Sequence, residues 1–334
     1  MNLLINCTSL KKINNHINLK LGGIESLNIE LAEALSKKKI NVTITSKSKR
    51  INKKGKIKLI PINHIKKNPY KFSFNSIISS NDATIFNYYP KCKNKIFWLH
   101  NKLQIEKSIR KKQFSSIIKN RPIAVFVSKY LEKKTSKLYF FKKRLVINNF
   151  LSPSFNTKKN NLKRNPIFVW SVQRDVGLND TINMWKNIIY KKNPKAKFYV
   201  LGNNSFEKEN NKRYLRTKNI FFLGRVNKNR LKEIYSKSTA MICLGYDETF
   251  CLNALEANSC GLPILTFGKT ALNSYIKDNH NGFIVKDFDQ LAKKILVLTN
   301  TNNSNYIKLS NSSFFHSKKY YLSNIIYNWL KLLK

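Results

Sequence analysis

The stretch Thr239–Gly268, TAMICLGYDETFCLNALEANSCGLPILTFG, decides the fold of this chain. Its first apolar run, 240–244, predicts a buried strand. A helix should begin at Thr249 or Phe250 and end at a Gly-Leu-Pro stop. The following apolar run, 262–267, predicts a second buried strand. Strand, helix and strand in this order form a βαβ unit, which is the building block of a parallel sheet.

The charges of this stretch mark a candidate binding site. The chain has 63 Lys and Arg against 17 Asp and Glu, yet the only charged residues in 238–268 are Asp247, Glu248 and Glu256. Ligands of such units bind beyond the carboxyl ends of the strands, where a loop meets a helix N-terminus. Free N–H groups there can receive phosphate oxygens, and carboxylates accept hydrogen bonds from sugar hydroxyls. The N–H groups concerned are those of Thr249, Phe250 and Cys251. The alternative is a capped core helix with two solvated acids.

The pattern Glu248-x7-Glu256, followed by Cys260-Gly261-Leu262-Pro263, resembles the signature of a known enzyme family. That family is the retaining nucleotide-sugar glycosyltransferases of the GT-B fold (family 4-like, group 1). The resemblance implies an α/β fold with two Rossmann-like domains facing each other across a cleft. It also implies that Glu248 faces the donor sugar and that Glu256 holds the nucleotide ribose.

Two segments of the first half extend the resemblance. Gly22-Gly23, between a strand and a helical repeat of leucines, is similar to the family's Gly-Gly-x-Glu opening, where backbone without Cβ atoms approaches the donor. The alternative for Gly22 and Gly23 is a tight connection. His100 follows the predicted strand 96–99, at the place where the family has a histidine facing the donor sugar. A lone histidine is otherwise more often structural.

The remaining first-half elements follow from apolar runs and helical spacing. Strands are predicted at 2–7, 40–45, 57–62, 83–87, 96–99 and 123–127, and a helix at 103–118. Ser128-Lys129-Tyr130 resembles the family's Val-Ser-x-Tyr step, and 145–150 resembles its closing strand. Phe150 stands where that strand has glycine.

The second half contains the expected donor machinery. Arg174 matches the first cation of the family's diphosphate-binding Arg…Lys-Gly segment, whereas Val176 stands where the lysine is expected. Lys269 and Arg225 are candidate substitutes. Val226 ends a segment that resembles the family's strand beside the nucleobase.

Domain boundaries follow from composition and from the family's architecture. Residues 1–155 are predicted to form the N-terminal domain, and the polar stretch 156–166, NTKKNNLKRNP, the linker. Residues 167–312 should form the nucleotide-sugar-binding domain. A terminal helix over 313–334, with Phe314, Tyr321, Ile325, Trp329 and Leu332 on one face, should brace the first domain.

Composition limits the class of protein. The five cysteines are scattered, and no metal-ligand motif occurs, so reduced core thiols and no metal or cofactor are expected. No apolar run approaches a membrane span, and the first residues predict a strand rather than a signal peptide. A cytoplasmic protein is therefore expected. The net charge is +46, but only 10 of the 63 basic residues are arginines. Because proteins that read bases and phosphates favour arginine, nucleic acid is not the expected partner.

These observations predict a retaining hexosyltransferase that moves a sugar from a nucleotide-diphosphate sugar to a growing surface glycan, lipopolysaccharide or another polysaccharide. Glu248, His100 and Arg174 would be its catalytic residues. The acceptor would be lipid-linked, and the basic surface would contact the anionic inner face of the cytoplasmic membrane. The alternatives are a basic polyanion-binding protein and a catalytically silent paralogue that only binds nucleotide sugar.

Overall fold

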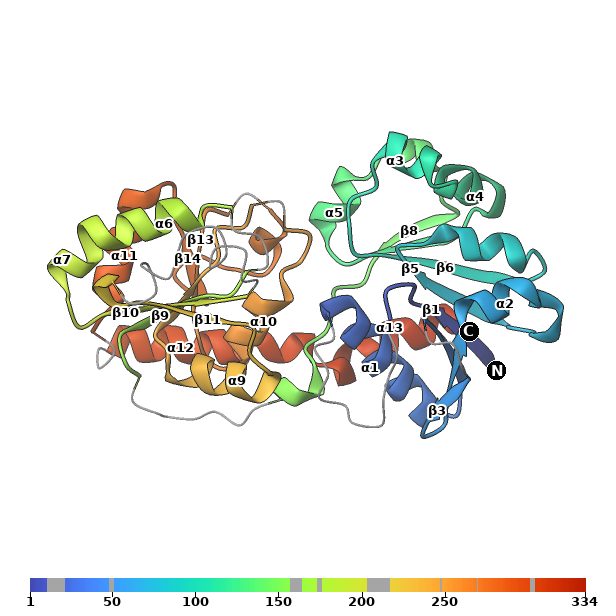
Figure 1. The fold of residues 1–334 in the computed structure, drawn as a ribbon, viewed down its shortest axis with the longest axis horizontal. Coiled ribbons are helices and arrows are strands. Elements are labelled where there is room, and N and C mark those ends of the chain that lie inside the picture. Colours follow the sequence, from blue (N-terminus) through green and yellow to red (C-terminus); the bar gives the residue numbers. More distant parts are fainter. Residues whose placement is uncertain are drawn as a thin grey trace. The chain divides into compact units, whose positions relative to one another are not determined.

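The computed structural model describes residues 1–10, 22–47, 51–156, 164–172, 176–202, 217–246, 248–268, 270–300 and 304–334 (Figure 1). The chain forms two compact units. The first contains Met1–Ser152 together with Tyr320–Lys334, and the second contains Pro153–Lys319. Each unit has its own sheet, and each is described here by itself.

The first unit is built on an eight-stranded sheet with the order β3-β4-β2-β1-β5-β6-β7-β8. All neighbours are parallel except β3 and β4. The strands are β1 (Asn2–Asn6), β2 (Asn41–Ser46), β3 (Asn52–Lys54), β4 (Ile57–Pro61), β5 (Ser76–Ser80), β6 (Asn94–Leu99), β7 (Ile123–Phe126) and β8 (Lys143–Val146). Because the central strands are covered on both faces, they consist almost entirely of buried residues.

Helices cover both faces of this sheet. In Figure 1, α1 and α13 lie together on one face, and α3 and α4 lie on the other. The helices are α1 (Gly23–Lys37), α2 (Ile62–Lys67), α3 (Ile105–Arg110), α4 (Gln113–Asn120), α5 (Lys129–Lys134) and α13 (Leu322–Leu333), with 3-10 turns η1 (Pro69–Lys71), η2 (Ala83–Tyr88) and η3 (Lys137–Tyr139).

Two first-half predictions were wrong. Residues 83–87 form the 3-10 turn η2, because the Asp82 side chain accepts a hydrogen bond from the Thr84 N–H and starts a turn there. The strand is Ser76–Ser80 instead. It was not predicted because three of its five residues are serines, so it is not an apolar run. The single helix expected at 103–118 is two helices, because Lys112 adopts a left-handed conformation (φ 54°) between α3 and α4.

The end of the chain completes the first unit. The helix expected to run to the C-terminus is interrupted by the 3-10 turn η9 (Lys318–Tyr320) between α12 (Ser304–Ser317) and α13. In α13 the buried residues are Leu322, Ile326, Trp329 and Leu333, so the face is shifted from the expected Tyr321, Ile325 and Leu332. The Trp329 ring packs on Trp98 of β6, with 4.8 Å between centroids. The first unit thus ends at Ser152 rather than 155, and only residues from Tyr320 on rejoin it.

The second unit is built on a six-stranded parallel sheet with the order β11-β10-β9-β12-β13-β14. Its strands are β9 (Ile167–Trp170), β10 (Lys197–Leu201), β11 (Ile220–Gly224), β12 (Ala240–Ile242), β13 (Ile264–Thr266) and β14 (Gly282–Ile284). Its other elements are η4 (Pro153–Phe155), α6 (Leu178–Met184), the π-helical turn η5 (Trp185–Ile189), α7 (Tyr190–Lys192), η7 (Thr217–Asn219), α9 (Lys228–Lys237), α10 (Leu252–Ser259), η8 (Ala271–Ser274), α11 (Phe288–Leu298) and α12. In Figure 1, α6 and α11 cover one face of this sheet, and α9, α10 and α12 cover the other.

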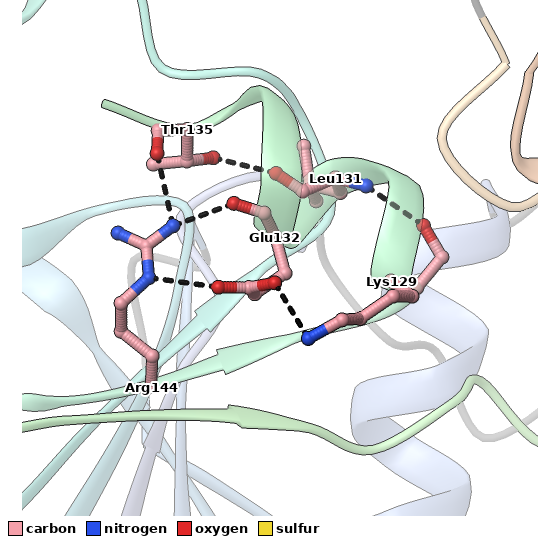
Figure 2. A network of polar contacts seen from close by, with 6 residues as sticks. Lys129, Leu131, Glu132, Thr135 and Arg144 are labelled. Carbon is pink, nitrogen blue, oxygen red and sulfur yellow. Dashed lines mark hydrogen bonds and ion pairs between the residues drawn. The ribbon is translucent and has the colours of Figure 1, made fainter. Parts of the chain in front are cut away.

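A polar network fixes α5 to the edge of the first sheet (Figure 2). Ser128 caps α5 by accepting a hydrogen bond from the Leu131 N–H at 3.1 Å. Arg144 of β8 donates to the Glu132 carboxylate at 3.1 Å and to the Thr135 carbonyl at 2.9 Å, while Lys129 pairs with the other carboxylate oxygen at 3.0 Å. The Ser-x-Tyr segment noted in the sequence therefore begins a helix held by charge-assisted bonds.

We expect Arg144→Met to lower the free energy of unfolding by about 2–3 kcal/mol, because three backbone carbonyls lose their arginine donor and the part-buried Glu132 carboxylate keeps only Lys129. Hydrogen bonds from Lys129 and then Arg144 lower the pKa of the Glu132 carboxyl, so its contribution is present above pH 4.5 and is lost as the pH falls. Urea unfolding at neutral and acid pH measures both effects.

The matched control is Arg230→Met, which removes an arginine from the exposed pair Arg230–Glu233. That variant should change the free energy of unfolding by no more than about 0.5 kcal/mol. Equal losses for the two variants would contradict the role assigned to Arg144.

Candidate functional site

The strand order of the second unit leaves a crevice at one edge of its sheet. β9 and β12 are parallel neighbours, with Met241 paired to Val169. The chain leaves β9 toward β10 and β11, and it returns to β12 and continues toward β13 on the other side. In open α/β sheets, ligands bind outside the carboxyl ends of the strands at such a reversal. The stretch that follows β12 contains Glu248 and Glu256.

The helix after β12 starts later than expected. α10 begins at Leu252 rather than at Thr249 or Phe250, because Cys251 has a left-handed backbone (φ 62°, ψ 78°) that cannot belong to the helix. The Cys251 side chain does not cap the helix, so it accepts no hydrogen bond from the N–H groups of the first turn of α10. A non-glycine residue in this conformation is strained, and such strain gathers at functional sites.

One side chain fixes the start of α10 against the end of β9. The amide of Asn253, in the first turn of α10, donates to the Ser171 carbonyl and lies 3.4 Å from the Ser171 hydroxyl. Ser171 directly follows β9. The N-terminus of α10, with its partial positive charge, therefore lies at the reversal between β9 and β12.

The loop that contains Glu248 is held by the segment after β13. The Glu248 carbonyl accepts a hydrogen bond from the Ala271 N–H at 3.2 Å. Phe250 is only 3% exposed and stacks on Tyr275, whose hydroxyl donates to the Cys251 carbonyl at 3.3 Å. The Phe250 side chain thus belongs to the core, and any contact of this loop with phosphate would be made by its backbone.

Glu256 is half-buried, and its charge acts on Tyr235 of the neighbouring helix α9. Tyr235 of α9 is fully enclosed, and burial followed by the charge of the Glu256 carboxylate raises its pKa well above the usual value. Tyr235 is therefore neutral at physiological pH, and the charge of the Glu256 carboxylate contributes to this. This partner was missed in the sequence, because only the fold brings α9 beside α10.

The backbone after β12 is crowded by polar atoms of β13 and its loop. Gly245 has φ 82°, and a Cβ at this position would lie 3.1 Å from the Thr270 hydroxyl and 3.2 Å from the Thr266 hydroxyl. The Thr270 hydroxyl is buried and has no hydrogen-bond partner among the described residues. A buried hydroxyl of this kind needs a partner, and a bound ligand or water would provide one.

Some residues predicted for donor binding have no described position. Arg174, with its neighbours 173 and 175, and Lys269 lie outside the described residues. Val176 is described and 53% exposed. Gly177 (φ 85°) starts α6 and packs so closely on Leu244 that a Cβ would lie 2.7 Å from that side chain. The start of α6 therefore lies beside the loop after β12.

Arg225 and Val226 follow β11, at the edge of the sheet. Arg225 is exposed and Val226 is half-buried. β11 is separated from β9 by β10, so Arg225 begins about 10 Å to the side of the β9 exit. That spacing places Val226 beside the crevice rather than within it.

The first unit places its own predicted residues at the carboxyl edge of its sheet. Gly22 is the exposed N-cap of α1, with an extended backbone (φ −72°), and Gly23 is the first residue of that helix. Among the described atoms, a Cβ at Gly22 would meet only the flexible end of Glu25. The described fold therefore does not require glycine at position 22, and close approach by a ligand would explain it.

His100 is interior in this structure. It follows β6, is 4% exposed, and packs on Trp98 with 4.4 Å between ring centroids. Its backbone N–H donates to the Asn81 side chain at 2.9 Å. Burial lowers the pKa of His100 to about 3, so the ring is neutral at physiological pH.

A row of buried polar side chains at this edge was missed in the sequence. Asn6 at the end of β1 donates to the Ser79 hydroxyl at 2.9 Å and accepts from the Thr45 hydroxyl at 2.9 Å. Ser80 donates to Asn28 of α1 at 2.8 Å. The signal was available, because β1, β2 and β5 all end in polar residues.

All five cysteines are free and buried. Within the described ranges, no three His, Cys, Asp or Glu side chains gather in a group able to hold a metal ion. No helix in the described part of the chain is long and apolar enough to span a bilayer.

Comparison with known proteins identifies the family. Residues 154–310 match the family described as glycosyl transferases group 1. This segment of the chain therefore belongs to the group 1 glycosyltransferases. The expected α/β fold of two Rossmann-like units is confirmed. The match lies wholly within the second unit, which contains Glu248 and Glu256.

Two solved structures and one curated relative are similar to this chain. WaaG, a glycosyltransferase involved in lipopolysaccharide biosynthesis, is 13% identical, with a TM-score of 0.70 over 99% of both chains. HepE (Alr3699) of Anabaena, solved with UDP, is 11% identical, with a TM-score of 0.72 over 100% of this chain and 99% of that one. A D-inositol 3-phosphate glycosyltransferase of Stackebrandtia nassauensis is 32% identical over 60 residues, which are 18% of this chain and 14% of that relative's length. The two structures establish the fold of this chain, and the short match establishes no substrate.

We expect His100→Gln to weaken the acid sensitivity of folding. The unfolded chain takes up a proton on this histidine near pH 6.5, whereas the folded chain does so only near pH 3. The folded state therefore loses stability as the pH falls below 6.5. Between pH 7.5 and 5, the free energy of unfolding of His100→Gln should fall by about 2 kcal/mol less than that of the wild type. Urea unfolding at both pH values tests this, and parallel losses in the two proteins would contradict it.

Proposed function

We propose that this protein is a glycosyltransferase that transfers a hexose from a nucleotide-diphosphate sugar to a growing surface glycan, with retention at the anomeric carbon. The observation that supports this most is the start of α10 at the β9–β12 reversal, with Glu248 before it and Glu256 within it. A helix N-terminus suits a diphosphate, and half-buried carboxylates suit sugar hydroxyls.

Each residue has a proposed role in the reaction. The N-termini of α6 and α10, with Arg174, stabilise the charge that builds on the leaving diphosphate. Glu256 accepts hydrogen bonds from the ribose hydroxyls, and Glu248 from hydroxyls of the transferred sugar. The glycosidic bond to the diphosphate breaks as the acceptor oxygen bonds to the anomeric carbon on the same face, and the acceptor's proton passes to a leaving-phosphate oxygen. No metal or cofactor takes part in this proposal.

His100 and the Gly22-Gly23 turn are proposed to contact the donor from the first unit. Because the His100 ring is neutral, it would orient the sugar through a hydrogen bond rather than deliver a proton. In the present structure the ring is buried, so this role requires that the residues around it move on binding.

The acceptor is proposed to be a lipid-linked glycan at the cytoplasmic face of the membrane. The support is a group of exposed apolar side chains on two joined elements, α3 and η3, which the Ser108 and Tyr139 hydroxyls link at 3.0 Å. These side chains are 37–61% exposed: Ile105, Ile109, Leu138 and Phe140. Lysines and arginines surround them in sequence. Apolar side chains among basic ones suit an anionic lipid surface, and the similarity to WaaG agrees with a glycan acceptor of this kind.

Val176 favours one alternative, a silent paralogue that binds nucleotide sugar without transferring it. Its exposed side chain occupies the position where the family's second phosphate-binding cation is expected. Turnover distinguishes the two proposals, since both require donor binding.

We expect UDP-, GDP- or ADP-sugars to raise the melting temperature, with the shift growing as RT ln(1 + [L]/Kd). Glu256→Gln should lower the affinity for the nucleotide sugar that binds about tenfold, because the ribose hydroxyls lose a charged hydrogen-bond acceptor. Glu248→Gln should lower kcat more than it raises KM. Thermal shift and sugar transfer to membrane-extracted acceptors measure these quantities.

The matched control is Glu233→Gln, which makes the same change on the exposed surface of α9. Its donor affinity and kcat should equal those of the wild type. If no nucleotide shifts the melting temperature, or if Glu233→Gln weakens binding as much as Glu256→Gln, the proposed donor site is wrong.

Val176→Lys should tighten binding of the nucleoside diphosphate about tenfold, because it restores a cation at the start of α6. The control is Val297→Lys, which adds the same charge at a 68% exposed valine of α11 in the same unit. Equal gains for the two variants would show a general charge effect. No gain for Val176→Lys would place the diphosphate elsewhere.

A further inference from the structure

The amino-terminal edge of the first sheet contains a cavity that the proposed transfer reaction does not use. The parallel strands β6, β7 and β8 begin side by side at this edge, opposite the edge that holds His100. The cavity has a volume of about 440 Å³. Four basic residues line it together with Cys92 and Asn120: Lys93, Lys95, Arg121 and Lys142. This volume is large enough for a phosphorylated head group or a sugar phosphate.

The charges of this cavity are not balanced within the protein. Its lining contains no Asp or Glu, and none of its four basic side chains forms an ion pair with a described residue. A second cavity, in the second unit, provides a contrast. Four basic residues line that cavity as well, but its Glu233 pairs with Arg230 at 2.6 Å and with Lys237 at 2.8 Å. Of these two cavities, the first-unit one gathers like charges without an Asp or Glu in its lining.

Lys95 is held in place inside the cavity rather than extending into solvent. Its ammonium group donates to the Asn120 side chain at 2.8 Å and to the Pro90 carbonyl at 3.1 Å. Burial, and to a lesser degree the charge of Lys119, lower the pKa of Lys95. A bound anion would offset both effects, because it stabilises the charged form of a lysine.

Arg121 occupies a backbone position that favours glycine. It is the C-cap of α4 in the left-handed region (φ 40°, ψ 58°), and its N–H donates to the Ile117 carbonyl at 2.7 Å. Glycine is the usual residue at such a position because it has no Cβ. The chain has instead one of its 10 arginines here, at the mouth of a cationic cavity. Arginine offers a planar pair of donors that matches phosphate oxygens.

We propose that this edge of the first sheet is a binding site for a phosphate-bearing anion, contacted by Lys93, Lys95, Arg121 and Lys142. Four cations around one concavity suit a group with two or more negative charges, such as a phosphate monoester or a diphosphate. The group is either a soluble phosphate or the head group of an anionic phospholipid. The site goes beyond the proposed transfer reaction, because it lies at the opposite edge of the sheet from the candidate donor-facing residues of this unit.

The test uses Arg121→Gly in the full chain, with inorganic pyrophosphate as the soluble probe. Because the left-handed backbone suits glycine, this variant should fold with a melting temperature at least equal to that of the wild type. Calorimetric titration at fixed ionic strength should show pyrophosphate affinity reduced about tenfold in Arg121→Gly and in Lys95→Met.

The matched control is Lys39→Gly. Lys39 is an exposed, left-handed basic residue (φ 62°) in the same unit, outside the cavity lining. The Lys39→Gly variant loses one positive charge at the same kind of backbone position. Its affinity for pyrophosphate should stay within twofold of that of the wild type. Equal weakening by Lys39→Gly and Arg121→Gly would overturn the proposal in favour of a general electrostatic field.

Vesicles distinguish the two sources of phosphate. Arg121→Gly should reduce binding to vesicles of phosphatidylcholine with 20% phosphatidic acid if a lipid head group occupies the cavity. If only the pyrophosphate affinity changes, the ligand is soluble. Glu256→Gln separates this site from the proposed donor site, since it should leave the Arg121-dependent binding unchanged. Pyrophosphate and vesicle binding that are both unaffected by Arg121→Gly and Lys95→Met would overturn the proposal.

Discussion

The reversal of strand order between β9 and β12 is the constraint on which the candidate site depends. Two parallel neighbours whose following segments leave in opposite directions cannot be covered by one helix, so their carboxyl ends remain open. The Asn253 amide then holds α10 against the end of β9, which aims the helix N-terminus at the opening. Glu248 and Glu256 gain their significance from that placement, because the same two acids on another helix of this basic chain would be ordinary solvated charges.

Most of the parallel core could be predicted from sequence, because most of the buried strands are short apolar runs between turn residues. The predictions failed where polar chemistry decides local structure. Asp82 starts a 3-10 turn in an apolar segment, and Ser76–Ser80 is a fully buried strand with three serines. Cys251 delays the start of α10 through a backbone conformation that the sequence does not reveal. At the site, the two acids were visible as a motif, whereas Tyr235 and Thr270 reach it only through tertiary packing.

Net charge describes this protein poorly until its distribution is known. Arg144 and Arg230 both have carboxylate partners, yet one joins a part-buried network and the other lies on an exposed helix face. Arg164 is buried and donates to the backbone carbonyls of Ser238 and Cys260. The cavity around Lys95 differs from all of these, because no Asp or Glu lines it. Position, rather than the sum of +46, decides which basic residues have a partner left to bind.

The return of the last helix has a consequence for the order of folding. Trp329 is completely buried against Trp98, and the Leu332 carbonyl accepts a hydrogen bond from Asn94. During synthesis, residues 1–152 leave the ribosome long before these partners exist. The second unit, which is one continuous segment, can fold first, while the nascent first unit exposes an unfinished apolar face. Translation must pass Trp329 and Leu332 before the earliest-made strands have a complete core.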